Sequence, residues 1–350
     1  MVKNLVFAVP GDLATPTGGY AYDRHIIDEL RNLGWQVEIL NLGSTFPWAN
    51  ETTRSTAQTR LLMVPEGGII VVDGLALGVL PEAARRLRAH HKLVALVHHP
   101  LALETGLSSS QAEILHASER VALAAAKHVI VTSPSTGRQL TADYGVAPDK
   151  ITVARPGNDP MPPAPGSRDG LVRLLSVGSI VPRKGFDVLI AALATLGDLP
   201  WRLTIAGDCT RDLPAAAQLD ADIARFGLGE RITMLGAISA GRLSQIYAEA
   251  DVFVLASRFE GYGMAYAEAI AHGLPVIGTR AGAIPDTVAS DAGLLVAPDD
   301  VGALALALHR LIKNADERQR MAAAAQAAAR RLPTWRESAQ IFSRAIEALE

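Results

Sequence analysis

Short apolar runs alternate with helical segments along most of the chain. The runs are uninterrupted and rich in valine, isoleucine and leucine, a pattern typical of strands buried on both faces of a parallel sheet. We predict such strands at residues 4–9, 37–40, 69–72, 93–97, 129–131, 151–153, 172–178, 203–208, 232–236, 252–255 and 276–277.

Between these runs, apolar residues recur at helical spacing. The clearest helices are predicted at residues 22–33, 81–90, 116–126, 264–272, 299–314, 316–331 and 335–349. Because strands and helices alternate, the chain is expected to form βαβ units and to have an α/β fold with parallel sheets. Residues 46–60 are polar and show neither period, which predicts an irregular, mobile loop.

One segment in the middle of the chain has the composition of a linker. Residues 160–170, PMPPAPGSRDG, contain four prolines and two glycines and no periodic pattern. We therefore predict an N-terminal domain at residues 1–160, a linker at 161–170 and a C-terminal domain at 171–334.

Composition is compatible with two soluble α/β domains. The chain has 350 residues, of which 49% are hydrophobic, enough for two separate cores. Its formal net charge of −3 gives no overall field that would favour nucleic acid or an anionic membrane. The single cysteine, Cys209, excludes an intrachain disulfide framework and suits a reducing cytoplasm. No apolar run reaches the length of a membrane-spanning helix, so we expect a cytoplasmic protein.

The segment from Asp251 to Gly278 combines two carboxylates with a glycine loop. A predicted strand is followed by a loop containing Gly261 and Gly263, then by a helix and a second strand. Glu260 lies in the loop, and Glu268 lies in the helix eight positions later.

This order of groups suits a nucleotide diphosphate that carries a sugar. A helix N-terminus after a glycine loop offers free N–H groups and a positive dipole end to phosphate. Glu268, over one turn into the helix, can accept hydrogen bonds from ribose hydroxyls, and Glu260 faces whatever lies beyond the phosphates. The alternative is that Glu260 is a solvated loop charge and Glu268 a surface helix residue.

The sequence EGYGMAYAEAIAHGLPV, which starts at Glu260, resembles the E-x7-E signature of retaining nucleotide-sugar glycosyltransferases of family four. The resemblance implies the GT-B fold: two Rossmann-like domains that face each other across a cleft, with the donor held by the second domain. It implies that Glu260 lies near the sugar and Glu268 on the ribose, with the donor also bound by Gly261, Tyr262, Gly263 and Met264. It further implies that the C-terminal helix, residues 335–350, returns to the first domain.

Two places in the first domain are candidates for the same site. Gly18 and Gly19 lie in the loop after the first strand, and the resemblance implies that this loop reaches the donor phosphates. His98 and His99 follow the strand at 93–97, at the sheet edge where ligands bind. The resemblance implies a histidine here that holds a sugar hydroxyl or orients the acceptor, and we assign the role to His98. The alternative is a histidine that only caps the strand.

In the second domain, the strand at 172–178 is followed by Gly178, Ser179 and then the adjacent cations Arg183 and Lys184. Cations at a helix entrance would neutralise a diphosphate and help it to leave. Compared with the resembling family, Ser179 stands where arginine is usual, and we expect Arg183 to replace the missing cation. The alternative is that Arg183 points to solvent and Lys184 acts alone. The loop at residues 278–286 resembles the family's glycine-rich loop, with Ala283 and Asp286 as departures from it.

Together with the resemblance, these residues predict a metal-independent, retaining glycosyltransferase of the hexosyltransferase type without a cofactor. Its catalytic residues would be Glu260, His98, Lys184 and Arg183. No D-x-D pair stands at a strand end, and neither histidine has a cluster of further ligands at metal-binding spacing, so no metal site is expected.

The expected partners are a nucleotide-sugar donor and a hydroxyl acceptor, and no nucleic acid. The base, the sugar and the acceptor are left open by the sequence. Two other functions also remain open: a nucleotide-sugar epimerase or phosphorylase of similar fold, and a non-catalytic protein that binds sugar nucleotides. The basic run at residues 85–92 would suit weak contact with an anionic membrane surface or acceptor, but a solvated helix face is the simpler interpretation.

Overall fold

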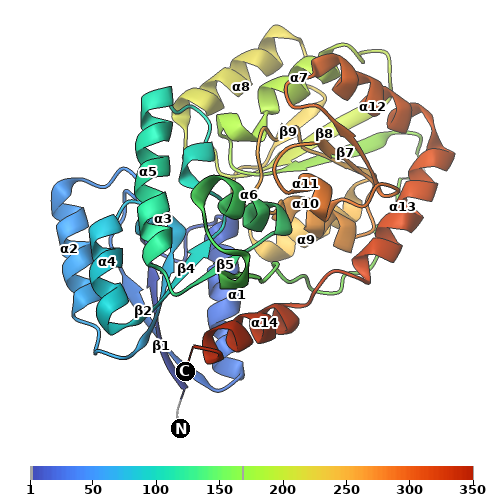
Figure 1. The fold of residues 1–350 in the computed structure, drawn as a ribbon. Coiled ribbons are helices and arrows are strands. Elements are labelled where there is room, and N and C mark those ends of the chain that lie inside the picture. The colour runs from blue at the N-terminus through green and yellow to red at the C-terminus, as the bar shows by residue number, and fades with distance from the viewer. Residues whose placement is uncertain (1–2, 168, 350) are drawn as a thin grey trace. The chain divides into compact units, whose positions relative to one another are not determined.

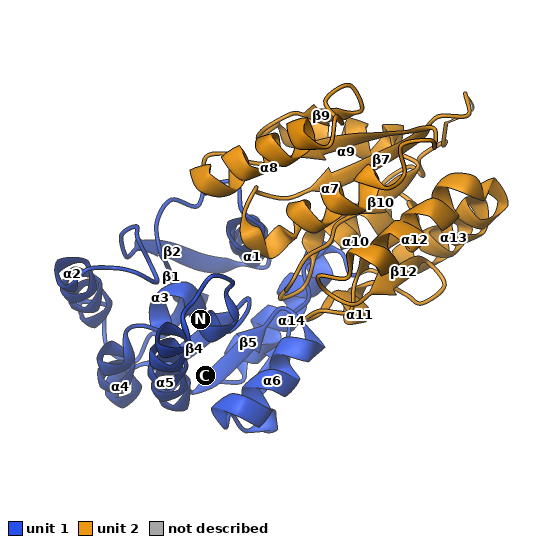
Figure 2. Cartoon of the chain, turned by 90° about the horizontal axis from the view of Figure 1, so that it is seen from above, with its two compact units in different colours: residues 1–157, 333–350 blue, residues 158–332 orange. Residues whose placement is uncertain are grey.

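The computed structural model describes residues 3–167 and 169–349, which form two compact units. Unit 1 comprises Met1–Gly157 and Pro333–Glu350, and unit 2 comprises Asn158–Leu332 (Figures 1 and 2). Each unit is a six-stranded parallel sheet with flanking helices. The predicted α/β class and the two Rossmann-like domains are therefore confirmed.

The sheet of unit 1 has the strand order β2-β1-β3-β4-β5-β6, with every pairing parallel. Its strands are β1 (Lys3–Val9), β2 (Trp35–Asn41), β3 (Ile69–Asp73), β4 (Lys92–Val97), β5 (His128–Val131) and β6 (Ile151–Val153). The helices of this unit are α1 (Gly18–Asn32), α2 (Glu51–Leu62), α3 (Gly74–Leu77), α4 (Pro81–His90), α5 (Ser109–Ala125), α6 (Pro134–Tyr144) and α14 (Trp335–Glu347).

The sheet of unit 2 has the order β12-β11-β10-β7-β8-β9 and is also parallel throughout. Its strands are β7 (Val172–Val177), β8 (Trp201–Ala206), β9 (Ile232–Met234), β10 (Val252–Val254), β11 (Val276–Thr279) and β12 (Gly293–Val296). The helices are α7 (Phe186–Ala194), α8 (Leu213–Arg225), α9 (Ala240–Glu249), α10 (Met264–Ala271), α11 (Ile284–Thr287), α12 (Val301–Lys313) and α13 (Ala315–Ala329).

The strand order of each sheet reverses direction at one place. In unit 1 the chain turns from β1 and β2 to β3, and in unit 2 it turns from β7, β8 and β9 to β10. Loops at the carboxyl ends of the strands that flank such a reversal part from one another, and ligands of open α/β sheets bind there. These two places are where the candidate residues of each unit are found.

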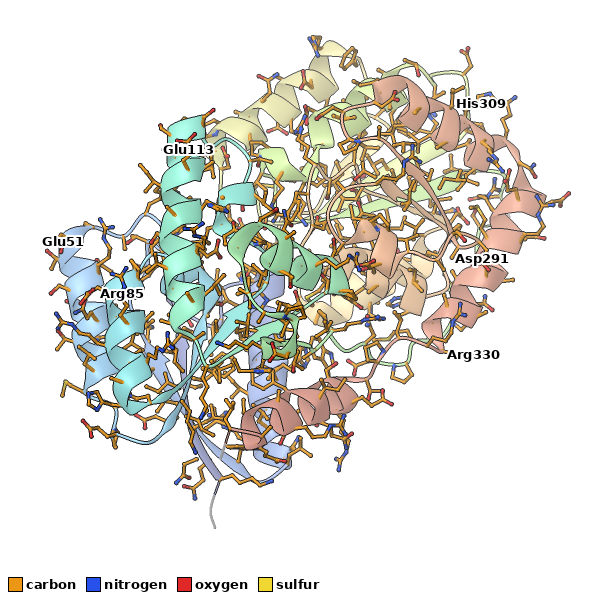
Figure 3. All side chains as sticks on the ribbon, viewed as in Figure 1. Glu51, Arg85, Glu113, Asp291, His309 and Arg330 are labelled. Atoms are coloured by element: carbon orange, nitrogen blue, oxygen red, sulfur yellow. The ribbon has the colours of Figure 1, made fainter. Side chains whose placement is uncertain are left out.

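Burial on both faces of each sheet explains the uninterrupted apolar runs in the sequence. The strands β3, β4 and β10 carry side chains that are almost wholly inaccessible to solvent, because helices cover both faces of each sheet. Charged side chains such as Glu51, Arg85 and Glu113 point away from the layers into solvent (Figure 3).

The polar segment predicted as a loop at residues 46–60 is largely helical. Helix α2 begins after Asn50, whose side chain accepts a hydrogen bond from the Thr53 N–H at 2.9 Å. Only Ala57 and Leu61 of this helix are buried. Its apolar face thus contains only two buried residues, too few for a helical period to be visible in the sequence.

The segment predicted as a linker, residues 161–170, is part of unit 2. The chain therefore passes from unit 1 to unit 2 earlier, after Gly157. The Ala164 N–H donates to the His272 carbonyl at 2.8 Å. The Ser167 N–H donates to the Asp251 carboxylate at 2.6 Å. These bonds attach the proline-rich segment to the surface of unit 2, and its composition alone did not predict them.

The basic run at residues 85–92 is largely occupied by contacts within unit 1. Arg85 and Arg86 pair with Glu82 at 3.5 Å and 3.3 Å, and Arg88 donates to the Ala124 carbonyl at 3.3 Å. These exposed contacts support the interpretation as a solvated helix face. Among the described residues, no helix combines the length and apolar character needed to cross a membrane.

Helix α14 packs on the sheet and on α1 of unit 1 through its apolar face. Phe342 is fully buried and stacks with Phe7 of β1, with ring centroids 6.3 Å apart. Ser343 accepts a hydrogen bond from the Trp35 indole N–H at 2.8 Å. At the point where the chain passes from unit 1 to unit 2, a side chain on Gly157 would overlap the backbone of Trp335.

We predict that Phe342→Ala destabilises unit 1 by about 3–5 kcal/mol, because it leaves a cavity between α14 and β1. Arg336→Ala, on the exposed face of the same helix, should change stability by less than about 0.5 kcal/mol. Urea unfolding monitored by circular dichroism compares the two. Equal stabilities for both variants would show that α14 does not contribute to the core of unit 1.

Candidate active site

The helix N-terminus predicted to bind phosphate is formed by α10 in unit 2. Gly263 precedes the helix in the left-handed conformation, with φ of 88°, and no side chain caps the helix. The N–H groups of Met264 and Ala265 have no hydrogen-bond acceptor among the residues that the structure describes. Two free donors and the positive end of the helix dipole thus converge on one point.

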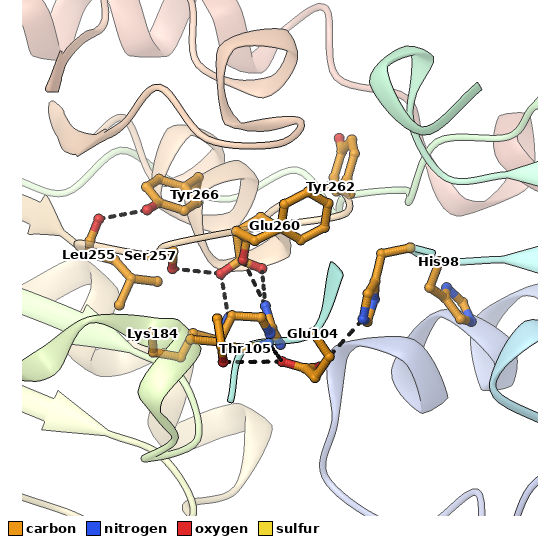
Figure 4. Close-up of polar contacts among 12 residues, drawn as sticks. His98, Glu104, Thr105, Lys184, Leu255, Ser257, Glu260, Tyr262 and Tyr266 are labelled. Carbon is orange, nitrogen blue, oxygen red and sulfur yellow. Dashed lines mark hydrogen bonds and ion pairs between the residues drawn. The ribbon is translucent and has the colours of Figure 1, made fainter. Parts of the chain in front are cut away.

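Glu260 lies in the loop before this helix, with only 6% of its surface exposed. One carboxylate oxygen accepts hydrogen bonds from Lys184 Nζ and Ser257 Oγ, both at 2.7 Å (Figure 4). The other oxygen lies 3.3 Å from Arg183 Nη1. Burial by itself would raise the pKa of the Glu260 carboxyl, but the charges of Lys184 and Arg183 outweigh burial and lower the pKa to about 2.

The backbone around Glu260 is closely packed against the loop at residues 278–286. Gly282 has φ of 54°, and a side chain there would come within 2.2 Å of the Glu260 carbonyl oxygen. The Ala283 N–H donates to this same oxygen at 2.8 Å. The glycine-rich loop at residues 278–286 therefore supports Glu260 directly, and the departure at Ala283 preserves this contact because only its backbone takes part.

Glu268 lies on α10 and is partly exposed. Its Oε2 accepts a hydrogen bond from the Tyr247 hydroxyl at 2.9 Å. Burial raises the pKa of the Glu268 carboxyl to about 7, although the Tyr247 hydrogen bond and the charge of Lys184 act in the opposite direction. The carboxylate is thus poised to change its charge near neutral pH.

The two cations lie on the short 3₁₀ turn Pro182–Lys184. Arg183 also donates to the Phe259 carbonyl at 2.9 Å, so it is bound to the Glu260 loop and does not point to solvent. Gly185, which ends the turn, has φ of 65°, and a side chain there would overlap the Ala256 carbonyl. A glycine at this position lets the turn approach the loop after β10.

Gly178 and Ser179 follow β7 beside this turn. The aliphatic part of Lys184 passes over Gly178, where an added Cβ would meet Lys184 Cε at 3.1 Å. Gly178 thus makes space for the lysine stem. Ser179 is partly exposed and carries no charge, so Arg183 and Lys184 are the cations brought to Glu260 in unit 2.

In unit 1, Gly18 and Gly19 lie in the first turn of α1 and not in the preceding loop. The helix starts earlier than predicted because Thr17 caps it, accepting a hydrogen bond from the Tyr20 N–H at 3.2 Å. Among the described residues, the N–H groups of Gly18 and Gly19 have no acceptor. Gly18 and Gly19 therefore lie at the start of the helix, and their proposed contact with the donor phosphates stays a prediction.

His98 follows β4 and contacts two buried carboxylates. Its Nε2 lies 3.2 Å from Asp23 Oδ1 and 3.5 Å from Asp73 Oδ2. The neighbouring His99 lies 3.5 Å from Glu104. Asp23, Asp73 and His98 each offer one possible metal-ligand atom within 4.8 Å of the others. Spacing along the sequence did not reveal this cluster, because the three residues come from separate elements.

Sequence reasoning missed four residues that contact the candidate side chains. Two had a usable signal, since Asp73 ends the buried strand β3 and Ser257 follows the buried strand β10, both at the sheet edge where sites form. Tyr247 lies on α9, which was not predicted although Leu243, Ile246 and Tyr247 have helical spacing. Asp23 lies in α1 and carries no local signal, because its partners are distant in the sequence.

Two family models match the chain. The model described as "Glycosyl transferases group 1" matches residues 159–328, and that described as "Glycosyltransferase Family 4" matches residues 68–161. Among curated relatives, the chain is 29% identical over 250 residues to the MMP alpha-(1->4)-mannosyltransferase of Mycolicibacterium hassiacum. That match covers 65% of this chain and 58% of the relative, so the chain spans little more than half of its length.

Solved structures share the fold over nearly the whole chain. Sucrose-phosphate synthase from Thermosynechococcus elongatus has a TM-score of 0.84 at 22% identity, with 99% of both chains covered. HepE from Anabaena, solved in complex with UDP-glucose, has a TM-score of 0.76 at 19% identity, again with 99% of both chains covered. The likeness to the solved structures shows that the chain has the GT-B fold. The two family models, which together span residues 68–328, show that it belongs to the family-four glycosyltransferases.

Proposed function

We propose that the protein transfers a sugar from a nucleotide-diphosphate donor to an acceptor hydroxyl with retention of anomeric configuration. One observation carries this proposal. Glu260, bound by Lys184 and Arg183, lies directly before a helix with free N–H groups, and Glu268 follows one turn into that helix. Anion-binding and hydroxyl-binding groups therefore follow one another along unit 2 in the order of a sugar, a diphosphate and a ribose.

The diphosphate would be bound by positive groups that the protein itself supplies. Lys184 bonds to Glu260 at 2.7 Å, and its positive charge also opposes the rise in the pKa of Glu268. Arg183 and the N–H groups of Met264 and Ala265 add further donors. Such groups stabilise the negative charge that develops on a departing diphosphate. HepE, with its bound UDP-glucose, is a precedent for this donor class on the same fold.

Retention is proposed from the resemblance to the retaining glycosyltransferases of family four, and a covalent intermediate is disfavoured because Glu260 is a poor nucleophile. Its carboxylate is bound by two cations and the Ser257 hydroxyl, and its pKa of about 2 indicates low basicity. We therefore propose that the leaving group departs and the acceptor attacks on the same face of the sugar, with Glu260 positioning the sugar. Unit 1 would bind the acceptor, with His98 as its principal polar group. An epimerase or a non-catalytic binding protein is not favoured, since both family models describe glycosyltransferases.

The donor class can be tested by thermal-shift screening of the full chain with UDP, GDP, ADP and their sugars. A ligand present at about 100 times its Kd should stabilise the folded protein by about 2.7 kcal/mol. The donor that stabilises it most should then support transfer to a hydroxyl acceptor, with the product anomer assigned by proton NMR. If none of the nucleotides or sugars raises Tm, the proposed donor class is wrong.

Glu268→Ala should weaken binding of the free nucleoside diphosphate roughly 10- to 150-fold, the loss of a hydrogen bond to a charged group. The 2′-deoxy nucleotide should bind the wild type with a similar loss and should be little affected by the mutation. Calorimetry measures both, with Glu249→Ala on the exposed face of α9 as the matched control. Equal affinity of Glu268→Ala and wild type for the ribonucleotide would exclude the assignment.

The same site should respond to pH. A carboxylate accepts ribose hydroxyls best when ionised, and Glu268 becomes protonated below a pKa of about 7. Nucleotide affinity should therefore fall as pH drops through 7, and Glu268→Ala should lose that dependence.

Glu260→Gln should lower kcat by one to three orders of magnitude while the affinity for the free nucleoside diphosphate stays the same or increases. The amide retains the shape of the side chain but no longer neutralises Arg183 and Lys184, which leaves both cations available to phosphate. Steady-state kinetics and calorimetry on the same preparation separate the two effects. A parallel loss of turnover and nucleotide affinity would contradict this division of roles.

Transfer should continue in excess EDTA, because Arg183, Lys184 and the helix N–H groups supply the positive charge that a divalent ion provides in other enzymes. The initial rate with and without the chelator is the measurement. A rate that is abolished by EDTA and restored by magnesium or manganese would refute the role given to the two cations.

A further inference from the structure

Two buried carboxylates of unit 1 converge on a single ring nitrogen of His98. Asp23 comes from α1 and is fully buried, and Asp73 lies at the end of β3 with 2% of its surface exposed. Their oxygens lie 3.2 Å and 3.5 Å from His98 Nε2. Burying carboxylates is costly unless they are paired, so this arrangement needs a positive partner.

The imidazole is fixed on several sides. Asp73 is itself fixed, because its Oδ1 accepts the Leu75 N–H at 2.7 Å. The Tyr22 ring packs edge-on to the imidazole with centroids 5.3 Å apart. Gly19 leaves room for the ring, since a Cβ there would lie 3.4 Å from His98 Cδ2. The ring therefore has one orientation, set by contacts with α1 and β3.

This orientation decides which nitrogen meets a ligand. Ionised carboxylates only accept hydrogen bonds, so Nε2 carries a proton. The Nδ1 atom has no hydrogen-bond partner among the described residues, and the side chain remains 20% exposed. A substrate would therefore meet Nδ1, the nitrogen that the protein leaves available.

The surrounding charges favour an imidazolium. Burial alone would lower the pKa of His98, but Asp23 and Asp73 outweigh it and raise the pKa to about 10. Burial raises the pKa of Asp23 to about 7; the charge and hydrogen bond of His98 oppose this rise, and Asp73 adds a smaller increase. The other titratable neighbours are Tyr22, whose pKa is raised by burial and which stays neutral, and His99, which pairs with Glu104.

We infer that Asp23 and Asp73 are positioning residues that hold His98 as a fixed cation, with Nδ1–H offered to a substrate oxygen. His98 then acts as a charged hydrogen-bond donor and not as a general base, because a base needs a free lone pair. The identity of the substrate oxygen rests on the proposed function, whereas the charge and orientation of His98 do not. A divalent metal ion is the rival occupant, and it would require Nε2 to lose its proton.

The charge state can be measured by NMR on the full chain with isotope-labelled histidine, with His98→Gln identifying the signal. In the wild type, both ring nitrogens of His98 should stay protonated from about pH 6 to about pH 9. Asp23→Asn and Asp73→Asn should each lower the pKa of His98 by at least about one unit. A neutral His98 at pH 7.5 in the wild type overturns the inference without any variant, and so does an unchanged pKa in both variants.

A second experiment tests for a metal site by adding zinc or manganese alone to chelator-treated protein. The His98 signals and Tm should not change. Saturable binding of one ion per chain, lost in Asp23→Asn, would show a metal site in place of the fixed cation.

Transfer kinetics connect the charge to function. His98→Gln should lower kcat/KM roughly 10- to 150-fold, the loss of a charged hydrogen bond, whereas His99→Gln should change it less than about threefold. In Asp23→Asn the pKa of His98 is expected to be lower, so kcat/KM should fall as pH rises through that value. The wild type should not show this dependence. A purely structural loss would lower kcat/KM equally at every pH. If no transfer is found but the NMR result holds, the proposed function fails while the inference about His98 stands.

Discussion

The candidate site depends on one buried ion cluster, the carboxylate of Glu260 between Lys184 and Arg183. Removing a carboxylate from water is unfavourable, and only close cations and hydrogen bonds compensate for it. Because the pKa of Glu260 is lowered to about 2, this compensation stabilises the folded protein at neutral pH and is lost as pH falls towards 2. Gly185 and Gly282 permit this cluster to form, since each lets the backbone come close to a neighbouring carbonyl group that a side chain would overlap. The loop, the turn and the charges are therefore mutually dependent.

The two units use the same layout with different chemistry. Each brings a helix N-terminus with free N–H groups to the carboxyl end of a parallel sheet, near the place where the strand order reverses. Unit 2 adds an anion bound by two cations, whereas unit 1 adds His98, inferred to be a cation, in contact with the carboxyl groups of Asp23 and Asp73. In both units, a group of fixed charge is held by partners of opposite sign, so neither has to reorganise when charge develops on a substrate.

The sequence predicted well whatever depends on local pattern. The apolar runs predicted the strands, and the spacing of Glu260 and Glu268 along one loop and helix made them candidates. Local pattern was insufficient where tertiary contacts decide the structure. Helix α2 has a narrow apolar face, the start of α1 depends on the Thr17 cap, and the proline-rich segment is attached to unit 2 by backbone hydrogen bonds. The carboxylates around His98 are far apart in the sequence, so no spacing could reveal them.

The proposed donor site is tested most directly by a crystal structure with the nucleoside diphosphate that binds most tightly. The predicted complex has the ribose hydroxyls within hydrogen-bond distance of Glu268. Its phosphates contact Lys184 and the N–H groups of Met264 and Ala265. A nucleotide bound elsewhere on the chain, or one whose phosphates do not touch Lys184 or the start of α10, would contradict the account.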